Sequence, residues 1–170
     1  AIQRASIARR QARGEKLVGI KMGFTSRAKM EQMGVHDMIW GRLTDAMIVE
    51  DGGEIEHSAY VHPRVEPEIA FLLKAPLKGK VSLAQATAAI EAAAPALEII
   101  DSRYRNFKFS LTDVVADNSS SSGFVVGPWQ RPDFDLSNLG MLMTVHGRGQ
   151  ECGSSAAILG NPLRSLSAAA

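Results

Sequence analysis

Two glutamates, Glu66 and Glu68, lie one residue apart inside an apolar run, and this spacing constrains the fold more than any other feature of the chain. In a β-strand, residues i and i+2 point to the same face of the sheet, so the two carboxylates would lie side by side against a core. A third carboxylate, Glu98, lies at the centre of a second apolar run, residues 95–101. Pro67, between the first two acids, predicts an edge strand or a bulge.

The three carboxylates need a compensating positive charge if they are buried. Without one they repel each other and shift to the neutral form. An all-oxygen ligand set suits a hard divalent ion, so Mg²⁺ is the expected cation and Mn²⁺ an acceptable one. The alternative is that each glutamate pairs with an arginine or lies on a solvated sheet face. The third acid, the apolar flanks and the proline leave both interpretations open.

Composition fits one globular unit. The chain has 170 residues, of which 45% are hydrophobic and 22% charged, and this predicts a single domain over residues 1–170 with a sizeable core. Lys and Arg number 19 against 18 Asp and Glu, so no strong field attracts nucleic acid or an anionic membrane. The single cysteine, Cys152, excludes an internal disulfide framework and favours a reducing cytoplasm. No apolar stretch approaches the roughly 20 residues of a membrane span.

The two ends of the sequence suggest that the domain is incomplete. The chain starts at Ala1 without a methionine, and residues 163–170 are typical of the first turns of a helix that stops before any cap. We therefore expect a chain that is truncated at both ends.

The pattern of apolar and turn residues predicts more strands than helices. Helices are expected at residues 2–13, 26–32 and 82–94, and strands at residues 16–23, 46–50, 65–73, 123–127 and 141–146. Ser82 is the expected cap of the third helix, and Pro95 is expected to end it, which places Glu98 on the strand that follows. The irregular placement of the helices between the strands predicts an α+β domain rather than a doubly wound sheet.

Several other side chains have a structural and a functional interpretation. Lys21 lies in the middle of an apolar strand, where a lysine commonly extends to solvent, but it could also face an anionic substrate or donate a proton. Ser119 and Ser120 follow Asp117 and Asn118, and this run could form a plain loop or supply donors to a carboxylate. The histidines show no ligand spacing and are interpreted as non-ligands; they are His36, His57, His62 and His146.

Four segments together resemble a known family. They are Gly19-Ile20-Lys21-Met22-Gly23, His62 to Phe71, Ala96 to Arg103, and Val115-Ala116-Asp117-Asn118. In order and spacing they are similar to the 2-oxopent-4-dienoate hydratase and 4-oxalocrotonate decarboxylase family of the catechol meta-cleavage pathway, within the fumarylacetoacetate hydrolase-like superfamily. The resemblance runs over nearly the whole chain. Residues 104–109 and the serine run make it most similar to the decarboxylase branch.

The resemblance implies a fold and a set of site residues. The fold is a curled mixed β-sheet core with helices packed outside, and family members are longer at both ends. Glu66, Glu68 and Glu98 match the three magnesium ligands, and Lys21 matches the active-site lysine. The implied activity is Mg²⁺-dependent loss of CO₂ from 2-oxohex-3-enedioate (4-oxalocrotonate), a 2-oxo dicarboxylic acid, to give 2-hydroxypenta-2,4-dienoate.

Substrate contacts separate the decarboxylase from its relatives. Hydratases of the family have an acidic residue where this chain has Ile39, and hydration needs a base to orient and deprotonate water. We expect Ile39, Asp45, Ser119 and Ser120 to line the substrate site. In an Ile39→Asp variant, Asp45 or another polar neighbour would be needed to hold a water. The alternatives are the hydratase, an acylpyruvate-type hydrolase, or a non-catalytic partner subunit. The family also implies a homo-oligomer and association with the pathway hydratase.

Overall fold

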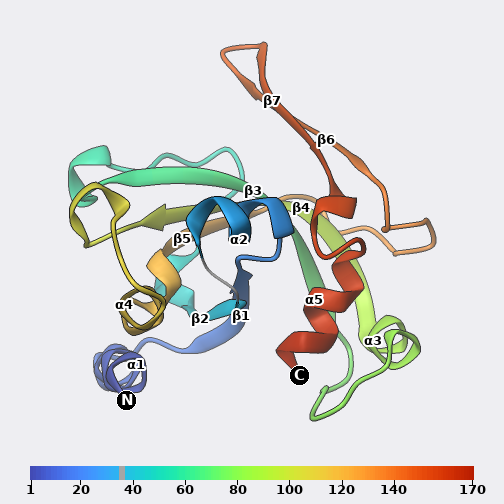
Figure 1. Cartoon of the computed structure of the whole chain (residues 1–170), viewed down its shortest axis with the longest axis horizontal. Helices are drawn as coiled ribbons and strands as arrows, with labels where there is room; N and C mark the ends of the chain where they lie inside the picture. The colour runs from blue at the N-terminus through green and yellow to red at the C-terminus, as the bar shows by residue number, and fades with distance from the viewer. Residues whose placement is uncertain (35–36) are drawn as a thin grey trace. The chain divides into compact units, whose positions relative to one another are not determined.

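The structure, a computed structural model, describes residues 1–34 and 37–170, where helices are mixed with small sheets (Figure 1). The helices are α1 (Ile2–Ala12), α2 (Arg27–Met33), α3 (Leu83–Ala89), α4 (Leu111–Ala116) and α5 (Pro162–Ala169). The strands are β1 (Leu17–Gly23), β2 (Ile39–Thr44), β3 (Pro63–Leu73), β4 (Ile90–Asp101), β5 (Ser121–Val126), β6 (Gly140–Val145) and β7 (Arg148–Ser154). The expected α+β class is confirmed.

Strand pairing is short-range in two sheets and long-range in the third. β1 pairs with β2 and β6 with β7, both antiparallel, whereas the third sheet has the order β3-β4-β5. Ile48 and Phe124 add an isolated parallel bridge. β3 is therefore an edge strand, as Pro67 predicts, and β4 between β3 and β5 carries Glu98.

The chain divides into two compact units. The first contains residues 1–24, 37–66 and 97–126, and the second contains residues 25–36, 67–96 and 127–170. In the first unit, α1 buries Gln3 and Ile7, which lie four residues apart and so share one face of the helix. The Nε2 of Gln3 donates a hydrogen bond of 2.8 Å to the carbonyl oxygen of Trp40 on β2. This bond anchors the helix to the strand.

Glu15 connects α1 with β2 after the helix ends. Its carboxylate accepts hydrogen bonds from Arg10 and Arg13, each at 3.0 Å, and from the hydroxyl of Thr44 at 2.7 Å. Thr44 is fully buried at the end of β2. Because β1 and β2 run antiparallel, this end of the pair lies opposite Leu17, and Lys21 lies opposite Gly41 further along.

The second unit contains two capped helices and an exposed hairpin. Ser82 and Gln85 form a reciprocal capping box at the start of α3, and Asn161 caps α5 through the amide of Leu163. α3 and α5 lie side by side (Figure 1). The β6–β7 hairpin, drawn in orange and red in Figure 1, turns at two residues with positive φ, His146 and Gly147, as a type I′ turn requires.

The helix expected over residues 82–94 is wrong beyond Ala89, because β4 begins at Ile90. Alanine favours helices, but tertiary pairing overrides that preference here. Ala93 exchanges two hydrogen bonds of 2.9 Å with Gln130, and the carbonyl of Ala89 accepts from Lys74 at 2.8 Å. Pro95 does not end the helix but lies within β4, where its carbonyl accepts a bond from Gly127.

The strand expected over residues 46–50 is also wrong in its first half. Residues Asp45–Met47 form a short 3₁₀-helix, η1, and strand-like pairing is limited to the bridge at Ile48 and the bond from Val49 to the carbonyl of Phe124. β2, α4 and β7 were not expected from the sequence. β2 lacks a long apolar run, and its central Gly41 weakens the strand pattern.

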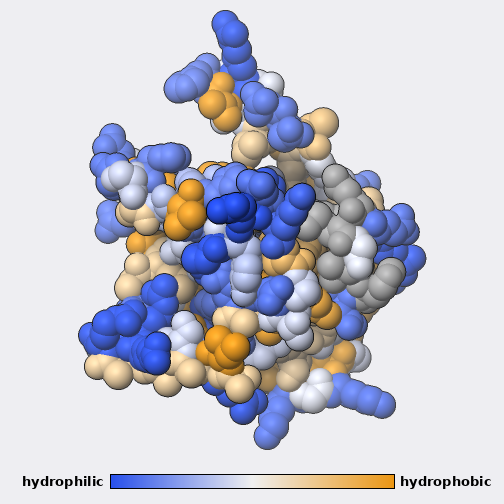
Figure 2. Space-filling model, turned by 60° about the vertical axis from the view of Figure 1, so that its left-hand side comes forward, coloured by the Kyte–Doolittle hydropathy of each residue, from blue (hydrophilic) through white to orange (hydrophobic). Residues whose placement is uncertain are grey.

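Hydrophobic side chains on the face shown in Figure 2 lie as separate small patches among hydrophilic ones. Among the described residues, the helices are all too short or too polar to cross a membrane.

Candidate metal centre

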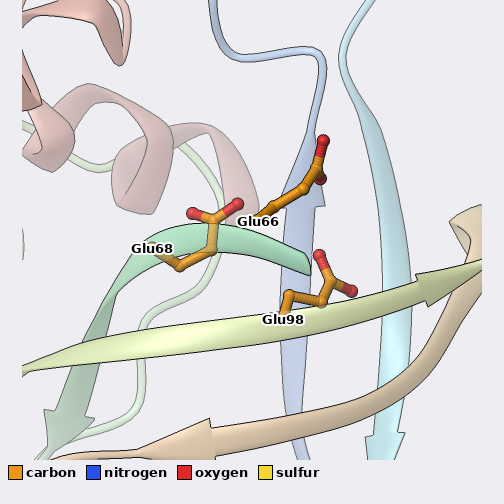
Figure 3. A group of neighbouring side chains, drawn as sticks. All are labelled: Glu66, Glu68 and Glu98. Atoms are coloured by element: carbon orange, nitrogen blue, oxygen red, sulfur yellow. The ribbon is translucent and has the colours of Figure 1, made fainter. Parts of the chain in front are cut away.

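The structure brings Glu66, Glu68 and Glu98 together from two neighbouring strands. Glu66 and Glu68 are alternate residues of β3, and Glu98 lies on the adjacent β4. Each glutamate has one carboxylate oxygen in the cluster, and these three oxygens all lie within 4.8 Å of one another. Figure 3 shows the three carboxylates on the same side of the two strands. Alternate residues of a strand point to the same face, so the i, i+2 spacing places Glu66 and Glu68 side by side.

Glu98 is the most deeply buried of the three and has two donors of its own. Lys21 Nζ donates to its Oε2 at 2.9 Å, and Ser121 Oγ donates to its Oε1 at 3.0 Å. The side chains of Lys21 and Glu98 are only 11% and 5% exposed. Lys21 is therefore not a solvent-extended surface lysine.

Burial sets the electrostatics of Glu98. It raises the pKa of the carboxyl above its ordinary value, and the charge of Glu66 adds to the rise, whereas Lys21 and Ser121 oppose it. The charged form is thus only partly compensated by the protein. A divalent cation between the carboxylates would favour that form.

The donor set fits Mg²⁺ or Mn²⁺. All three side chains offer carboxylate oxygens, which hard divalent cations prefer. Lys21 and Ser121 each use one lone pair on an oxygen of Glu98, and a carboxylate oxygen has a second lone pair for a metal.

Ile39 lies beside Lys21. It is buried at the start of β2, and a Cβ built on Gly23 would lie 2.8 Å from Ile39 Cγ1 and 3.7 Å from Lys21 Nζ. An apolar side chain therefore borders the space next to the ammonium group.

The other expected substrate residues lie in two different surroundings. Asp45 is exposed, and its Oδ1 accepts hydrogen bonds from the backbone amides of Lys16 and Ala46 at 2.9 and 3.0 Å. Ser119 and Ser120 are buried next to Ser121 in the chain. Ser119 Oγ donates to the carbonyl of Trp40 at 2.8 Å, whereas Ser120 Oγ is buried without a hydrogen-bond partner.

Ser121 is the site residue that sequence reasoning missed. The run of four serines points to this region of the chain, but residue spacing alone does not show which of the four hydroxyls faces a carboxylate on another strand. No histidine belongs to the group of metal-ligand side chains found in the described part of the chain, and His36 lies outside the described residues.

Comparison with known proteins relates this chain to a decarboxylase and a hydratase. No protein-family model matches the chain. A 4-oxalocrotonate decarboxylase from Pseudomonas sp is 66% identical over 169 residues, which cover 99% of this chain and 66% of that protein. A 2-hydroxypent-2,4-dienoate hydratase from Pseudomonas putida is 41% identical over 159 residues, covering 91% of this chain and 72% of the hydratase. The chain thus spans just under two thirds of the decarboxylase.

Solved structures agree with the sequence comparison. The 4-oxalocrotonate decarboxylase from Pseudomonas putida G7, complexed with magnesium and adipate, matches with a TM-score of 0.93 and 46% identity over 97% of this chain and 64% of that one. A fumarylpyruvate hydrolase from Pseudomonas aeruginosa, complexed with Mn²⁺ and pyruvate, has a TM-score of 0.63 at 14% identity over 87% of this chain and 70% of that one. The second likeness concerns the fold alone. The fold expected from the superfamily is confirmed.

Proposed function

The chain belongs to the family of 4-oxalocrotonate decarboxylases and 2-hydroxypent-2,4-dienoate hydratases, and from this membership we propose that it serves the magnesium-dependent decarboxylation of 4-oxalocrotonate. The reaction converts 2-oxohex-3-enedioate to 2-hydroxypenta-2,4-dienoate and CO₂ in the meta-cleavage degradation of catechols. The higher identity to the decarboxylase, 66% against 41% for the hydratase, favours this member of the family.

One observation carries the metal-dependent part of the proposal: three carboxylates cluster on β3 and β4, and the most buried one is paired with a lysine whose side chain is only 11% exposed. We assign Glu66, Glu68 and Glu98 as the residues that hold Mg²⁺, with Mn²⁺ as an alternative. When bound, the ion supplies Lewis-acid stabilisation of negative charge on the ketone oxygen of a 2-oxo acid. The donor set supports this assignment because it is all oxygen.

Lys21 is the proposed catalytic residue. When the C5–C6 bond of the substrate breaks, C6 leaves as CO₂ and the electron pair passes through the conjugated alkene to the ketone oxygen. Protonation of that oxygen gives the 2-hydroxydienoate. Lys21 Nζ, 2.9 Å from Glu98, lies beside the carboxylate cluster and can stabilise the charge and donate the proton. This charge appears fully only as the bond breaks, so the ammonium lowers the barrier rather than merely binding substrate.

Four residues are proposed to line the substrate site. Ile39 excludes water from the space next to Lys21, which suits decarboxylation because no attacking water is needed. Ser120 Oγ, buried without a partner, is available to bind a polar substrate group, and Ser119 Oγ keeps its acceptor lone pairs. Asp45 is the least supported member, because its carboxylate already accepts two backbone hydrogen bonds.

We extend the proposal to the assembly of the protein. β3 and β4 each contribute residues to both compact units, which supports one catalytic domain over residues 1–170. We also propose a homo-oligomer and a complex with the pathway hydratase, as the resemblance to the family implies. The single cysteine supports a cytoplasmic location, and the near-neutral charge gives no support to nucleic acid or a membrane as partner.

The test is an assay of CO₂ release from 2-oxohex-3-enedioate by the chain with Mg²⁺, with a chelator-treated sample as the control. We expect Mg²⁺-dependent CO₂ and negligible loss of 2-hydroxypenta-2,4-dienoate absorbance. Robust hydration of the dienoate without CO₂ would show the hydratase instead. An inactive but folded chain that binds no Mg²⁺ would indicate a non-catalytic partner subunit.

A further inference from the structure

Three consecutive residues before β5 form a buried left-handed turn. Asn118, Ser119 and Ser120, the short helix η4, have φ angles of 53°, 56° and 59°, and none of them is glycine. Left-handed backbone is unfavourable for residues with a Cβ, so the surrounding contacts must hold it. All three are almost fully buried.

The contacts that hold the turn come from β2. The side-chain amide of Asn118 makes two hydrogen bonds of 2.9 Å to the backbone of Arg42, accepting from its N–H and donating to its carbonyl oxygen. Ser119 Oγ donates to the carbonyl of Trp40. The turn is thus fastened to the strand on both sides of Gly41. The fit there is tight, since a Cβ on Gly41 would lie 2.5 Å from the carbonyl oxygen of Asn118.

This junction lies next to both donors of Glu98. Ser121, whose Oγ donates to Glu98 Oε1, directly follows the turn, and its Oγ is 2.9 Å from the same Cβ position on Gly41. Lys21, whose Nζ donates to Glu98 Oε2, pairs with Gly41 in the β1–β2 ladder. A shift of the turn relative to β2 would therefore change the position of Ser121 Oγ relative to the carboxylate of Glu98.

We infer that Asn118 is a positioning residue of the metal centre, which fastens the left-handed turn to β2 and thereby holds Ser121 Oγ against Glu98. The inference rests on the proposed function, because it takes Glu98 to be a metal ligand. Asparagine suits both tasks at this position. It tolerates a positive φ better than most residues, and its amide offers one acceptor and one donor to a single backbone residue.

The test measures Mg²⁺ affinity by calorimetry in folded variants. Asn118→Gly keeps the left-handed backbone accessible but removes the amide. Loss of a hydrogen bond to a metal ligand typically weakens metal binding by about 10–100-fold, so displacement of Ser121 Oγ from Glu98 should weaken Mg²⁺ binding by up to that factor. Asn118→Asp keeps the acceptor but sets an oxygen against the carbonyl of Arg42, so it should also weaken binding. The matched control is Asn161→Gly, which removes a different contact between an asparagine side chain and the backbone, the cap of α5 in the other unit, and should leave Mg²⁺ affinity unchanged.

A double variant distinguishes positioning from a general loss of stability. If Asn118 acts through Ser121, then Asn118→Gly combined with Ser121→Ala should bind Mg²⁺ within about threefold of Ser121→Ala alone. Two results would overturn the inference while leaving the proposed function standing. One is wild-type Mg²⁺ affinity in folded Asn118→Gly, and the other is a double variant whose loss of Mg²⁺ affinity equals the product of the losses in the two single variants. Absence of Mg²⁺ binding by the unmodified chain would overturn the proposed function and this inference with it.

Discussion

Gly41 offers a quantitative test of the close contact between β2 and the left-handed turn. An alanine Cβ at this position would lie 2.5 Å from the backbone oxygen of Asn118 and 2.9 Å from Ser121 Oγ, whereas ordinary contacts begin at 3.4 Å. The first neighbour is backbone and cannot rotate away. Separation to 3.4 Å would stretch the two 2.9 Å hydrogen bonds between Asn118 and Arg42 beyond bonding distance.

The expected magnitude follows from the opposing effects. Overpacking lowers the free energy of unfolding by about 1–3 kcal/mol. If the structure relieves the clash by breaking the two hydrogen bonds instead, each lost bond lowers it by about 0.5–1.5 kcal/mol. Replacing glycine stiffens the unfolded chain, which offsets about 0.4–1 kcal/mol. We therefore expect Gly41→Ala to lower the free energy of unfolding by up to about 2.6 kcal/mol, and to lie about 1–3 kcal/mol below a glycine replacement that makes no close contact.

Gly19→Ala is the matched control for this prediction. Gly19 lies on β1, also without a positive φ, and its added Cβ would meet only Leu43 Cδ1 at 3.8 Å. This variant should keep or raise stability, by up to about 1 kcal/mol, because only the unfolded-state effect remains. Urea unfolding followed by circular dichroism measures the free energy of unfolding of both variants. Midpoints are compared between variants that show the same dependence of this free energy on urea concentration. Equal midpoints for the two variants would refute the packing argument.

Four further predictions concern the metal centre and Glu15, which connects α1 with β2. Glu68→Gln preserves shape but removes a ligand charge, so Mg²⁺ affinity by calorimetry and CO₂ release should each fall by at least about 10²-fold; unchanged affinity would remove Glu68 from the site. Lys21→Ala should lower kcat measured at saturating Mg²⁺ by about 10²–10⁴-fold, and near-normal turnover would exclude a catalytic lysine. Ile39→Asp should depress CO₂ release, because a charged and hydrated side chain would replace an apolar one beside Lys21; an unaffected rate would argue against water exclusion. Burial works to raise the pKa of Glu15, but hydrogen bonds from Thr44, Arg10 and Arg13 outweigh it and hold that pKa below its ordinary value. The charged Glu15 should therefore stabilise the fold at pH values above its ordinary pKa, and this stabilisation should be lost as pH falls through the lowered pKa of the folded state. The urea midpoint of Glu15→Gln should accordingly change less with pH over this acidic range than the urea midpoint of the unmodified chain.

The sequence predicted those parts of the fold whose signals are local. β3 was expected because apolar and β-branched residues flank its glutamates, and the cap at Ser82 marked the true start of α3. The end of that helix was not predictable, because Ala92, Ala93 and Ala94 favour a helix in isolation and become a strand only through partners such as Gln130, far along the chain. Tertiary pairing cannot be read from a window of neighbours.

The candidate site was likewise predictable where the sequence signal is local and was not predictable where it depends on contacts between distant residues. Strand periodicity predicted that Glu66 and Glu68 share a face, and the apolar flanks pointed to Glu98 as a third member. The partner of Lys21 was not derivable from spacing, since Lys21 and Glu98 are separated by 77 positions in sequence. The left-handed turn at residues 118–120 was equally hidden, because no glycine marks it.

The pairing of Lys21 with Glu98 changes how much positive charge the cluster would need from a cation. The ammonium group supplies one positive charge to the most buried of the three carboxylates, and its own side chain is only 11% exposed. A buried carboxylate without a partner is costly, so this charge has to be offset within the protein or by a bound ion. The lysine therefore acts as a built-in counter-charge: a cation held by Glu66, Glu68 and Glu98 would have less negative charge to offset than in a three-glutamate site without a lysine.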